Sequence, residues 1–316
     1  SMQVVENLYP SRSSDGSVGW IRRFDEKVPV FRLSDQLYGS SRTPSRSGVI
    51  MVLRRNERLW ALLVDKVTAS AEVPADRFYR LPAVAGDADN GQFPAVVVED
   101  EGLSLYIAPE RLVPAAISGV QAPPPRVPTL QSLVRARASA PRPSSARRNA
   151  ETPPSTGAAR QIITFSLETD ASADPPVRFG ISAGQAIEIL NGLPVIPVPN
   201  APSFVAGLAL WRSQPVPVVD LGGWMGTGSV PYKAGCRLLI CRGTQAMNGA
   251  LPLLAIPAVD QFRKLDLPIE YKSWPHRPSW NTALALGIYQ AERSMLIFPD
   301  LDAIASFQAP PPGYRM

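Results

Sequence analysis

The sequence predicts a mainly β protein, because short apolar or alternating runs recur along the chain between clusters of turn-forming residues. Such runs include GVIMVL at 48–53, WALLVDKV at 60–67, QIITFSLE at 161–168 and CRLLIC at 236–241. Many short strands at close spacing are typical of sandwiches and small barrels. Helical signals are sparse, and the best predicted helix is SAGQAIEIL at 182–190, with Ser182 as its N-cap.

The length and composition indicate a globular protein with room for two domains. The chain has 316 residues, of which 45% are hydrophobic, which is enough to build a sizeable core. No apolar run approaches the roughly 18–20 residues that span a bilayer, and SMQVVENLYPSR at the start lacks the pattern of a signal peptide. We therefore expect a cytoplasmic protein without direct membrane insertion.

Residues 114–160 have the composition of a disordered linker. Seven arginines against one acidic residue give this segment a charge of +6, so the rest of the chain carries −1 of the net +5. The segment also holds nine prolines and no aromatic residue, too little apolar surface to offset the entropy of ordering. Leu130, Leu133 and Val134 fall at helical spacing within 129–140. This patch is either a transient helix without a role or a docking segment that folds on a partner.

The two sides of this linker repeat each other. Gly19 precedes Pro29 by ten residues, and Gly207 precedes Pro217 by ten. Two further pairs of segments align in the same order, namely 60–67 with 252–259 and 105–110 with 295–300. Because the matching residues and segments occur in the same order and at nearly equal spacing on both sides of the linker, they predict a duplicated module.

Two prolines, Pro215 and Pro217, interrupt the otherwise strand-like run GLALWRSQPVPVVDL at 207–221. Proline has no N–H to donate to a neighbouring strand, so we expect that side of the backbone at a sheet edge, a bulge or a barrel opening. Proline protects such an edge from pairing with further strands, and apolar residues beside it suit a controlled contact with another protein.

The stretch GLALWRSQPVPVVDLGGWMG at 207–226 resembles the signature of CheW-like domains, the adaptor modules of bacterial chemosensory arrays. The core of that signature reads Gly-x-x-Asn-Leu-Arg-Gly-x-x-x-Pro-Val-x-Asp-Leu. The resemblance covers 161–307 as a complete domain, called copy two below, and about 4–113 as a copy that lacks its first strands, called copy one. It implies a pair of small five-stranded, SH3-like barrels around a shared core in each domain, with few short helices.

The resemblance divides the chain into a divergent CheW-like domain at 1–113, the linker at 114–160, a complete CheW-like domain at 161–307 and a tail at 308–316. Either the first strands of copy one have been cut away, or another chain supplies them. In copy one, residues 22–25 occupy the Asn-Leu-Arg-Gly stretch and Arg32 replaces the aspartate.

In copy two Arg212 holds the arginine of the signature and Asp220 its aspartate, while Leu210 replaces the asparagine and Ser213 the glycine. Arg212 is either a solvated strand charge beside core residues or a group that reaches an acidic partner. Weighing both, we predict a partner-binding set made of Phe204, Leu210, Trp211, Arg212, Val216, Val218 and Asp220.

The function implied by the resemblance is that of a non-catalytic scaffold. Such a protein couples chemoreceptors to a histidine kinase by binding the cytoplasmic tips of the receptors and the regulatory domain of the kinase. We expect association with membrane receptor arrays, and self-association through barrel edges is a further possibility.

The residue inventory argues against an enzyme, a metal site or a cofactor site. His276 is the only histidine and has no nucleophile motif beside it. Cys236 and Cys241 are five residues apart, so a strand would point them to opposite faces. GDADNG at 86–91 lacks the later ligands of a calcium loop, and the glycines within 222–228 precede no phosphate-binding motif.

Two alternative functions stay open at this point. The chain could be the regulatory fragment of a chemotaxis-type histidine kinase, although neither a phosphotransfer histidine nor an ATP-site motif is visible. Nucleic-acid binding through a small barrel and the basic linker is disfavoured, because the linker arginines lack interleaved aromatic residues and the barrels carry no net positive charge.

Overall fold

The computed structural model describes most of both copies. The described residues are 8–10, 16–38, 48–55, 58–68, 72–86, 92–100, 102–108, 112, 161–167, 176–230, 232–246, 250–257, 259–266, 272–273, 285–291 and 294–306. The predicted linker at 114–160, the tail at 308–316 and His276 lie outside them. Within the described residues, no helix is long and apolar enough to cross a membrane.

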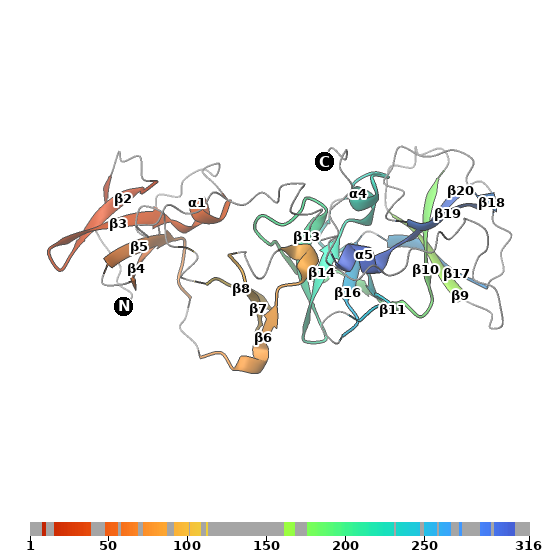
Figure 1. The fold of residues 1–316 in the computed structure, drawn as a ribbon, viewed down its shortest axis with the longest axis horizontal. Coiled ribbons are helices and arrows are strands. Elements are labelled where there is room, and N and C mark those ends of the chain that lie inside the picture. The colour runs from red at the N-terminus through yellow and green to blue at the C-terminus, as the bar shows by residue number, and fades with distance from the viewer. Residues whose placement is uncertain are drawn as a thin grey trace, which may run out of the picture. The chain divides into compact units, whose positions relative to one another are not determined.

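The mainly β fold predicted from the sequence is confirmed, and the chain forms two compact units (Figure 1). The first unit contains one sheet of copy one, and the second contains the rest of copy one together with all of copy two.

Copy two consists of two sheets within the second unit. One sheet has the order β11-β15-β16-β14-β13-β12, and the other has the order β17-β9-β10-β20-β19-β18. Both are open sheets of six strands in the described residues, where the resemblance implied closed five-stranded barrels. The strands of the first sheet are β11 (Ala186–Asn191), β12 (Val195–Ile196), β13 (Val205–Trp211), β14 (Gln214–Val219), β15 (Arg237–Arg242) and β16 (Leu253–Pro257). Those of the second are β9 (Gln161–Leu167), β10 (Val177–Ser182), β17 (Val259–Asp266), β18 (Lys272–Ser273), β19 (Ala285–Ala291) and β20 (Ser294–Pro299).

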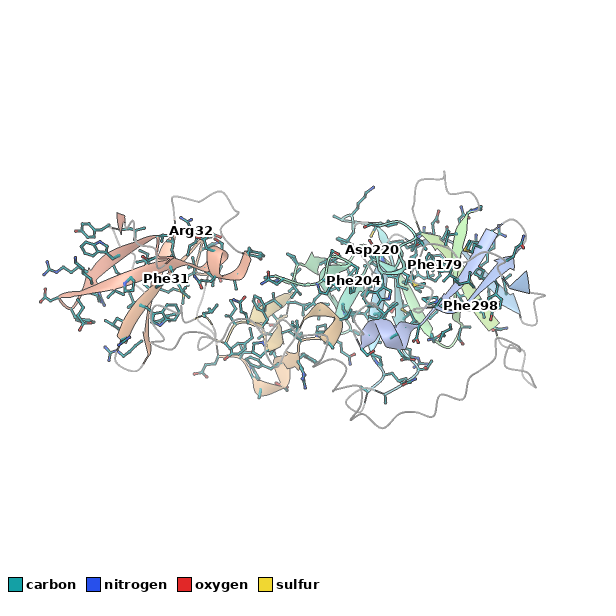
Figure 2. All side chains as sticks on the ribbon, turned by 45° about the horizontal axis from the view of Figure 1, so that its top comes forward. Phe31, Arg32, Phe179, Phe204, Asp220 and Phe298 are labelled. Atoms are coloured by element: carbon teal, nitrogen blue, oxygen red, sulfur yellow. The ribbon has the colours of Figure 1, made fainter. Side chains whose placement is uncertain are left out.

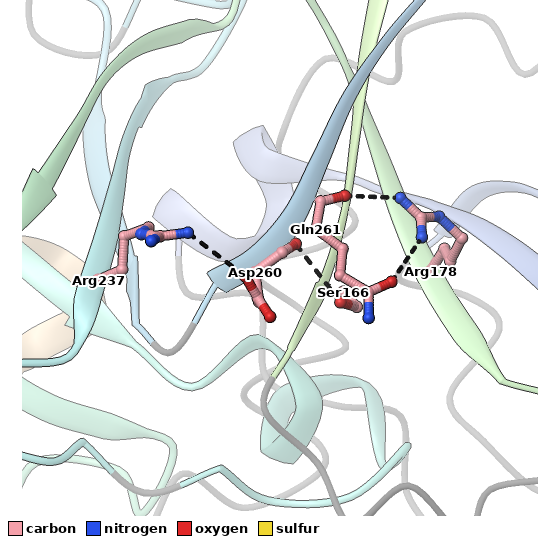
Figure 3. A network of polar contacts seen from close by, with 5 residues as sticks. All are labelled: Ser166, Arg178, Arg237, Asp260 and Gln261. Atoms are coloured by element: carbon pink, nitrogen blue, oxygen red, sulfur yellow. Dashed lines mark hydrogen bonds and ion pairs between the residues drawn. The ribbon is translucent and has the colours of Figure 1, made fainter.

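A polar network at β17 links the two sheets of copy two. The Arg237 side chain on β15 pairs with Asp260 on β17 at 3.3 Å (Figure 3). Beside it, Arg178 on β10 donates to the backbone oxygen of Gln261 at 2.8 Å and to its side-chain oxygen at 3.3 Å. Gln261 has a φ of 48° where the register of β17 shifts against β9. The arginine therefore holds a bulge in an unusual backbone conformation.

Copy one repeats the first sheet of copy two, which supports the duplication predicted from the sequence. Its order β1-β2-β3-β5-β4 matches β12-β13-β14-β16-β15, and an equivalent of β11 is missing from the described residues. The strands are β1 (Tyr9–Pro10), β2 (Gly19–Arg23), β3 (Glu26–Arg32), β4 (Val49–Arg55) and β5 (Arg58–Val64). Ile21, Val28, Val30, Ile50 and Ala61 form its core.

The remainder of copy one lies in the second unit, where it packs on copy two. It contains α1 (Leu33–Tyr38), two 3₁₀ turns, η1 (Ala75–Arg77) and η2 (Ala83–Ala85), and a small sheet of β6 (Phe78–Arg80), β7 (Ala95–Val98) and β8 (Leu103–Tyr106). This β6–β8 sheet contacts β13 and β14 through β8 and β7, and η2 contacts β13 and α5 (Leu301–Ala305). The Asn200 side chain also donates to the backbone oxygen of Leu37 at 2.9 Å.

The prolines of β14 do not lie at a sheet edge, because β14 sits between β13 and β16. Pro215 faces Leu210 and Pro217 faces Leu208 across the hairpin with β13. In an antiparallel hairpin with a two-residue turn, these two pairs are non-hydrogen-bonded pairs. An N–H group at position 215 or 217 would therefore point away from β13. On that far side β14 meets β16 through one pair, Val218 with Ala255. The two prolines therefore lie inside the sheet, on the side of β14 that faces β16, where the two strands share a single residue pair.

The helix predicted at 182–190 is wrong. Ser182 ends β10, and residues 186–191 form β11, which pairs antiparallel with β15. The local spacing of apolar residues in AIEIL fits either structure, and pairing with β15 decides between them.

The two cysteines are free, as the spacing of CRLLIC predicted. Cys241 is fully buried in β15, and burial raises the pKa of its thiol to about 12. A thiol that stays protonated in this way is a packing group and a poor nucleophile at neutral pH.

Gly207 should tolerate no side chain. Its φ is +146°, and a Cβ atom there would collide with the backbone oxygen of Ile196 on β12; a Cβ at the equivalent Gly19 would collide with the backbone oxygen of Tyr9. We predict that Gly207→Ala lowers the free energy of unfolding by about 2 kcal/mol or more, measured by chemical denaturation. Gly184→Ala is the control, because its nearest atom would be 3.8 Å away. Equal stability of the two variants would contradict this prediction.

Candidate protein interaction surface

The end of the β13–β14 hairpin presents two of the residues predicted to bind a partner. Arg212 and Ser213 connect the strands with φ values of 48° and 59°. Positive φ at both central residues is the mark of a type I′ turn, whose twist matches that of the flanking strands. The turn carries Arg212 into solvent, with 68% of its side chain exposed, and leaves Trp211 half-buried at the strand end.

Glu188 lies on β11, which is not a neighbour of β13 in the order of the sheet, and its side chain contacts both Trp211 and Arg212. One of its carboxylate oxygens accepts from the indole nitrogen of Trp211 at 3.0 Å and from the Arg212 guanidinium at 2.9 Å. The guanidinium also lies over the Trp211 ring, 4.7 Å from its centroid. Three side chains thus fix one another, and the contribution of the exposed ion pair to stability is small.

A hollow of about 500 Å³ opens beside Trp211. Its walls come from β11, β13, β14, β15 and the start of β16, and the residues are Ala186, Ile187, Trp211, Gln214, Arg242, Leu251 and Leu253. Leu251 is 40% exposed, so apolar surface is available at the rim. We call this hollow together with Arg212 and Glu188 the Trp211 surface. Its mixture of an aromatic ring, aliphatic side chains and arginines is the composition of many protein interface centres.

Val216, Val218 and Phe204 lie in the interior of copy two. Val216 and Val218 have no exposed surface and belong to the core cluster of the first sheet. Phe204 is 6% exposed and meets the Trp224 ring edge-on, with the ring centroids 4.2 Å apart. These three side chains have no area to offer a partner, and we leave them out of the surface.

The carboxylate of Asp220, which is labelled in Figure 2, accepts three hydrogen bonds from its own copy. It is the N-cap of α4 (Leu221–Met225) and accepts from the backbone nitrogen of Gly223 at 3.0 Å. Its other oxygen accepts from the Ser229 hydroxyl at 2.6 Å and from the backbone nitrogen of Val230 at 3.0 Å. The carboxylate therefore joins the helix start to the loop that follows it.

Leu210 is half-buried on the other face of β13 from Trp211, since neighbouring strand residues point to opposite faces. The structure therefore brings together only Trp211 and Arg212 among the predicted residues.

Sequence reasoning missed Glu188, Arg242 and Leu251 as members of the surface. Glu188 meets Trp211 although their strands are not neighbours in the sheet, and a local sequence pattern carries no signal for such a contact.

In copy one the same turn is made from other residues. Phe24 and Asp25, with φ values of 48° and 61°, join β2 to β3. Phe24 stands in the place of Arg212 and is 73% exposed, with the Arg23 guanidinium 4.9 Å from its ring centroid. The two copies thus share the turn and differ in the side chains that it presents.

Comparison with protein families gives a match to the CheW-like domain over residues 3–116 and 161–308. The chain belongs to the CheW-like domain family. The two matched regions confirm the recognition of two tandem CheW-like copies made from the sequence.

Among solved structures, the chain is similar to the crystal structure of the scaffolding protein TtCheW from Thermoanaerobacter tengcongensis. The identity is 23%, the match covers 50% of this chain and 98% of that chain, and the TM-score is 0.36. A comparison with curated proteins gives no match.

The Asp220 cap should be important for stability. We predict that Asp220→Ala lowers the free energy of unfolding by about 2 kcal/mol or more, because three donors lose their acceptor in a site where Asp220 is 6% exposed. Denaturation in urea measures this change. Asp100→Ala is the matched control, since that side chain is 83% exposed and its ion pair with Arg77 should contribute less than about 1 kcal/mol. A stability loss no larger than that of the control would refute a structural role for Asp220.

Proposed function

We propose that this CheW-like protein is a non-catalytic scaffold that couples chemoreceptors to a histidine kinase at membrane receptor arrays. Membership of the CheW-like family supports the adaptor role. The observation that carries the proposal is the Trp211 surface, which combines an open apolar hollow with an exposed, pre-positioned arginine.

The chemistry of the Trp211 surface suits a partner that inserts an apolar side chain and places an acidic group nearby. The hollow accepts the apolar group, and Arg212, which is already fixed by Glu188 and the Trp211 ring, reaches the acid. Pre-positioning lowers the entropy lost on binding, since the arginine need not be ordered by the partner. The regulatory domain of the kinase is the partner that we assign to this surface.

Two tandem copies let one scaffold hold two components. A second partner bound by the same chain would be kept at an effective concentration set by the linker at 114–160, which raises the overall strength of the assembly. Because copy one presents Phe24 where copy two presents Arg212, the two turns should select different partners.

Substitutions in the Trp211 surface test this function. We predict that Trp211→Ala and Arg212→Glu each weaken binding to the kinase regulatory domain at least tenfold, because one removes the wall of the hollow and the other reverses the charge at its rim. Isothermal titration calorimetry with the purified regulatory domain, and then with a receptor cytoplasmic tip, measures the two affinities separately.

Arg263→Glu is the matched control. Arg263 is also an exposed strand arginine of copy two, but it lies on β17 in the other sheet, so the same charge reversal there should leave both affinities unchanged. Wild-type affinity of Trp211→Ala and Arg212→Glu for the kinase domain, with the variants folded, would exclude this surface as the contact.

A further inference from the structure

A second arginine, Arg242, lines the hollow of the Trp211 surface. It ends β15, it is exposed, and it lines the hollow together with side chains from β11, β13, β14 and β16. In the order of the sheet, β16 and β14 separate β15 from β13, which carries Trp211. Arg242 and the pair of Trp211 and Arg212 therefore belong to two different parts of the sheet, although they meet at one hollow.

Backbone groups just before β11 hold Arg242 in place. Its side-chain Nε donates to the backbone oxygen of Gly184 at 3.0 Å, and its backbone nitrogen donates to that of Gln185 at 2.9 Å. It also pairs with Leu253 on β16. A guanidinium has five N–H donors, and the bond to Gly184 uses one of them. Because the acceptor is a neutral carbonyl, this bond orients the guanidinium without offsetting its charge.

The charges of the Trp211 surface sum to one positive charge. Arg212 is offset by Glu188, whose carboxylate lies 2.9 Å from the guanidinium, and Arg242 adds a further positive charge. The other residues that line the hollow are uncharged, namely Ala186, Ile187, Trp211, Gln214, Leu251 and Leu253. An acidic group of a partner is complementary to this surface, and the charge that Glu188 does not offset is that of Arg242.

The apolar part of the hollow is fixed by the core beneath it. Ile187, Trp211 and Leu253 line the hollow and also pack against the core cluster of the first sheet, to which Val216 and Val218 belong. Core side chains are close-packed, so these three have little freedom to move. A partner side chain placed in the hollow therefore meets apolar atoms that are already in position, which reduces the entropy lost on binding.

We propose that the Trp211 surface binds a segment in which one apolar side chain lies between two acidic residues. The apolar side chain fills the hollow, one acid pairs with Arg212, and the other pairs with Arg242. A guanidinium can bind a carboxylate through two parallel hydrogen bonds, so each contact is directional as well as attractive. Arg242 thus selects partners that carry the second acid. Only the assignment of this segment to the kinase regulatory domain rests on the proposed function.

A separate polypeptide suits this site better than the longer segments of the chain itself. The linker at 114–160 carries +6 and would bring positive charge to two arginines, and the tail at 308–316 has no acidic side chain to offer them. The stretch ETDASADP at 168–175 is acidic. Apart from one proline, however, its apolar residues are two alanines, which are too small to fill a hollow of about 500 Å³.

Synthetic peptides with a central leucine provide the probe. Each peptide carries an aspartate on both sides of the leucine, two to four residues away, with glycine and serine elsewhere, and it is labelled with fluorescein. We expect at least one of them to bind the full chain saturably in fluorescence anisotropy. Replacing both aspartates by asparagine should weaken that binding at least tenfold, because the negative charges are removed while the shape is kept.

Peptides with a single aspartate separate the roles of the two arginines. Arg242→Gln should weaken binding of one single-aspartate peptide at least fivefold and leave the other unchanged, and Arg212→Gln should show the opposite preference. A substitution that merely distorted the surface would weaken both peptides alike. Arg263→Gln, at an exposed arginine of the other sheet, is the control and should leave all affinities unchanged.

Four results would overturn the proposal. Three are the absence of saturable binding by the whole set, equal binding of the asparagine peptides, and an equal loss for both single-aspartate peptides in Arg242→Gln. The fourth is tighter peptide binding by a chain that carries Glu168→Gln, Asp170→Asn and Asp174→Asn together, since the occupant would then be this stretch of the chain itself.

Calorimetry with the kinase regulatory domain separates this proposal from the proposed function. If Trp211→Ala weakens binding of that domain and Arg242→Gln does not, the proposed function holds and the role of Arg242 is wrong. If the peptides behave as expected and the domain does not bind the unaltered chain, the chemistry of the segment holds and its assignment to the kinase is wrong.

Discussion

The short hairpin between β13 and β14 is the constraint on which the interaction surface depends. Its two-residue connection has positive φ at both central residues, Arg212 and Ser213, and it fixes which positions bond across the ladder. In that register Val216 and Val218 face the core. Pro215 and Pro217 take the positions that do not donate to β13, so their missing N–H groups remove no hydrogen bond between the two strands. The same register brings Trp211 to the strand end and Arg212 into solvent.

Sequence reasoning was most successful where the pattern repeats along the chain. The duplicated Gly and Pro spacing predicted two related modules, and β1 to β5 reproduce the order of five strands in copy two. It was less successful for side chains whose role depends on distant pairing. Asp220 and Arg212 both hold positions of the family signature, yet the structure gives Asp220 three internal donors and gives Arg212 an exposed position at a turn. Glu188 could not be placed beside Trp211 from the sequence, because the two residues lie on strands that are not neighbours in the sheet and meet only through their side chains.

The helix predicted at 182–190 shows the same limit in secondary structure. The segment contains residues that suit either a helix or a strand, and its backbone hydrogen bonds are decided by β15, about fifty residues away in the sequence. In copy one, an arginine at position 32 takes the place of the capping aspartate and pairs with Asp35 in the first turn of α1 at 3.7 Å. A helix thus follows the hairpin in both copies, although the interaction at its start differs.

The packing of the β6–β8 sheet against β13, β14 and α5 has a practical consequence for the way copy two can be handled. Val84, Ala85 and Val96, which lie on η2 and β7, are almost fully buried in the same compact unit as copy two. A fragment that begins at residue 161 would keep every strand of the complete domain, but it would expose to water the apolar area that these residues cover. Such a fragment would be prone to aggregate through this exposed apolar surface. The cause would be the missing β6–β8 sheet, since the strands of the fragment itself would be unchanged.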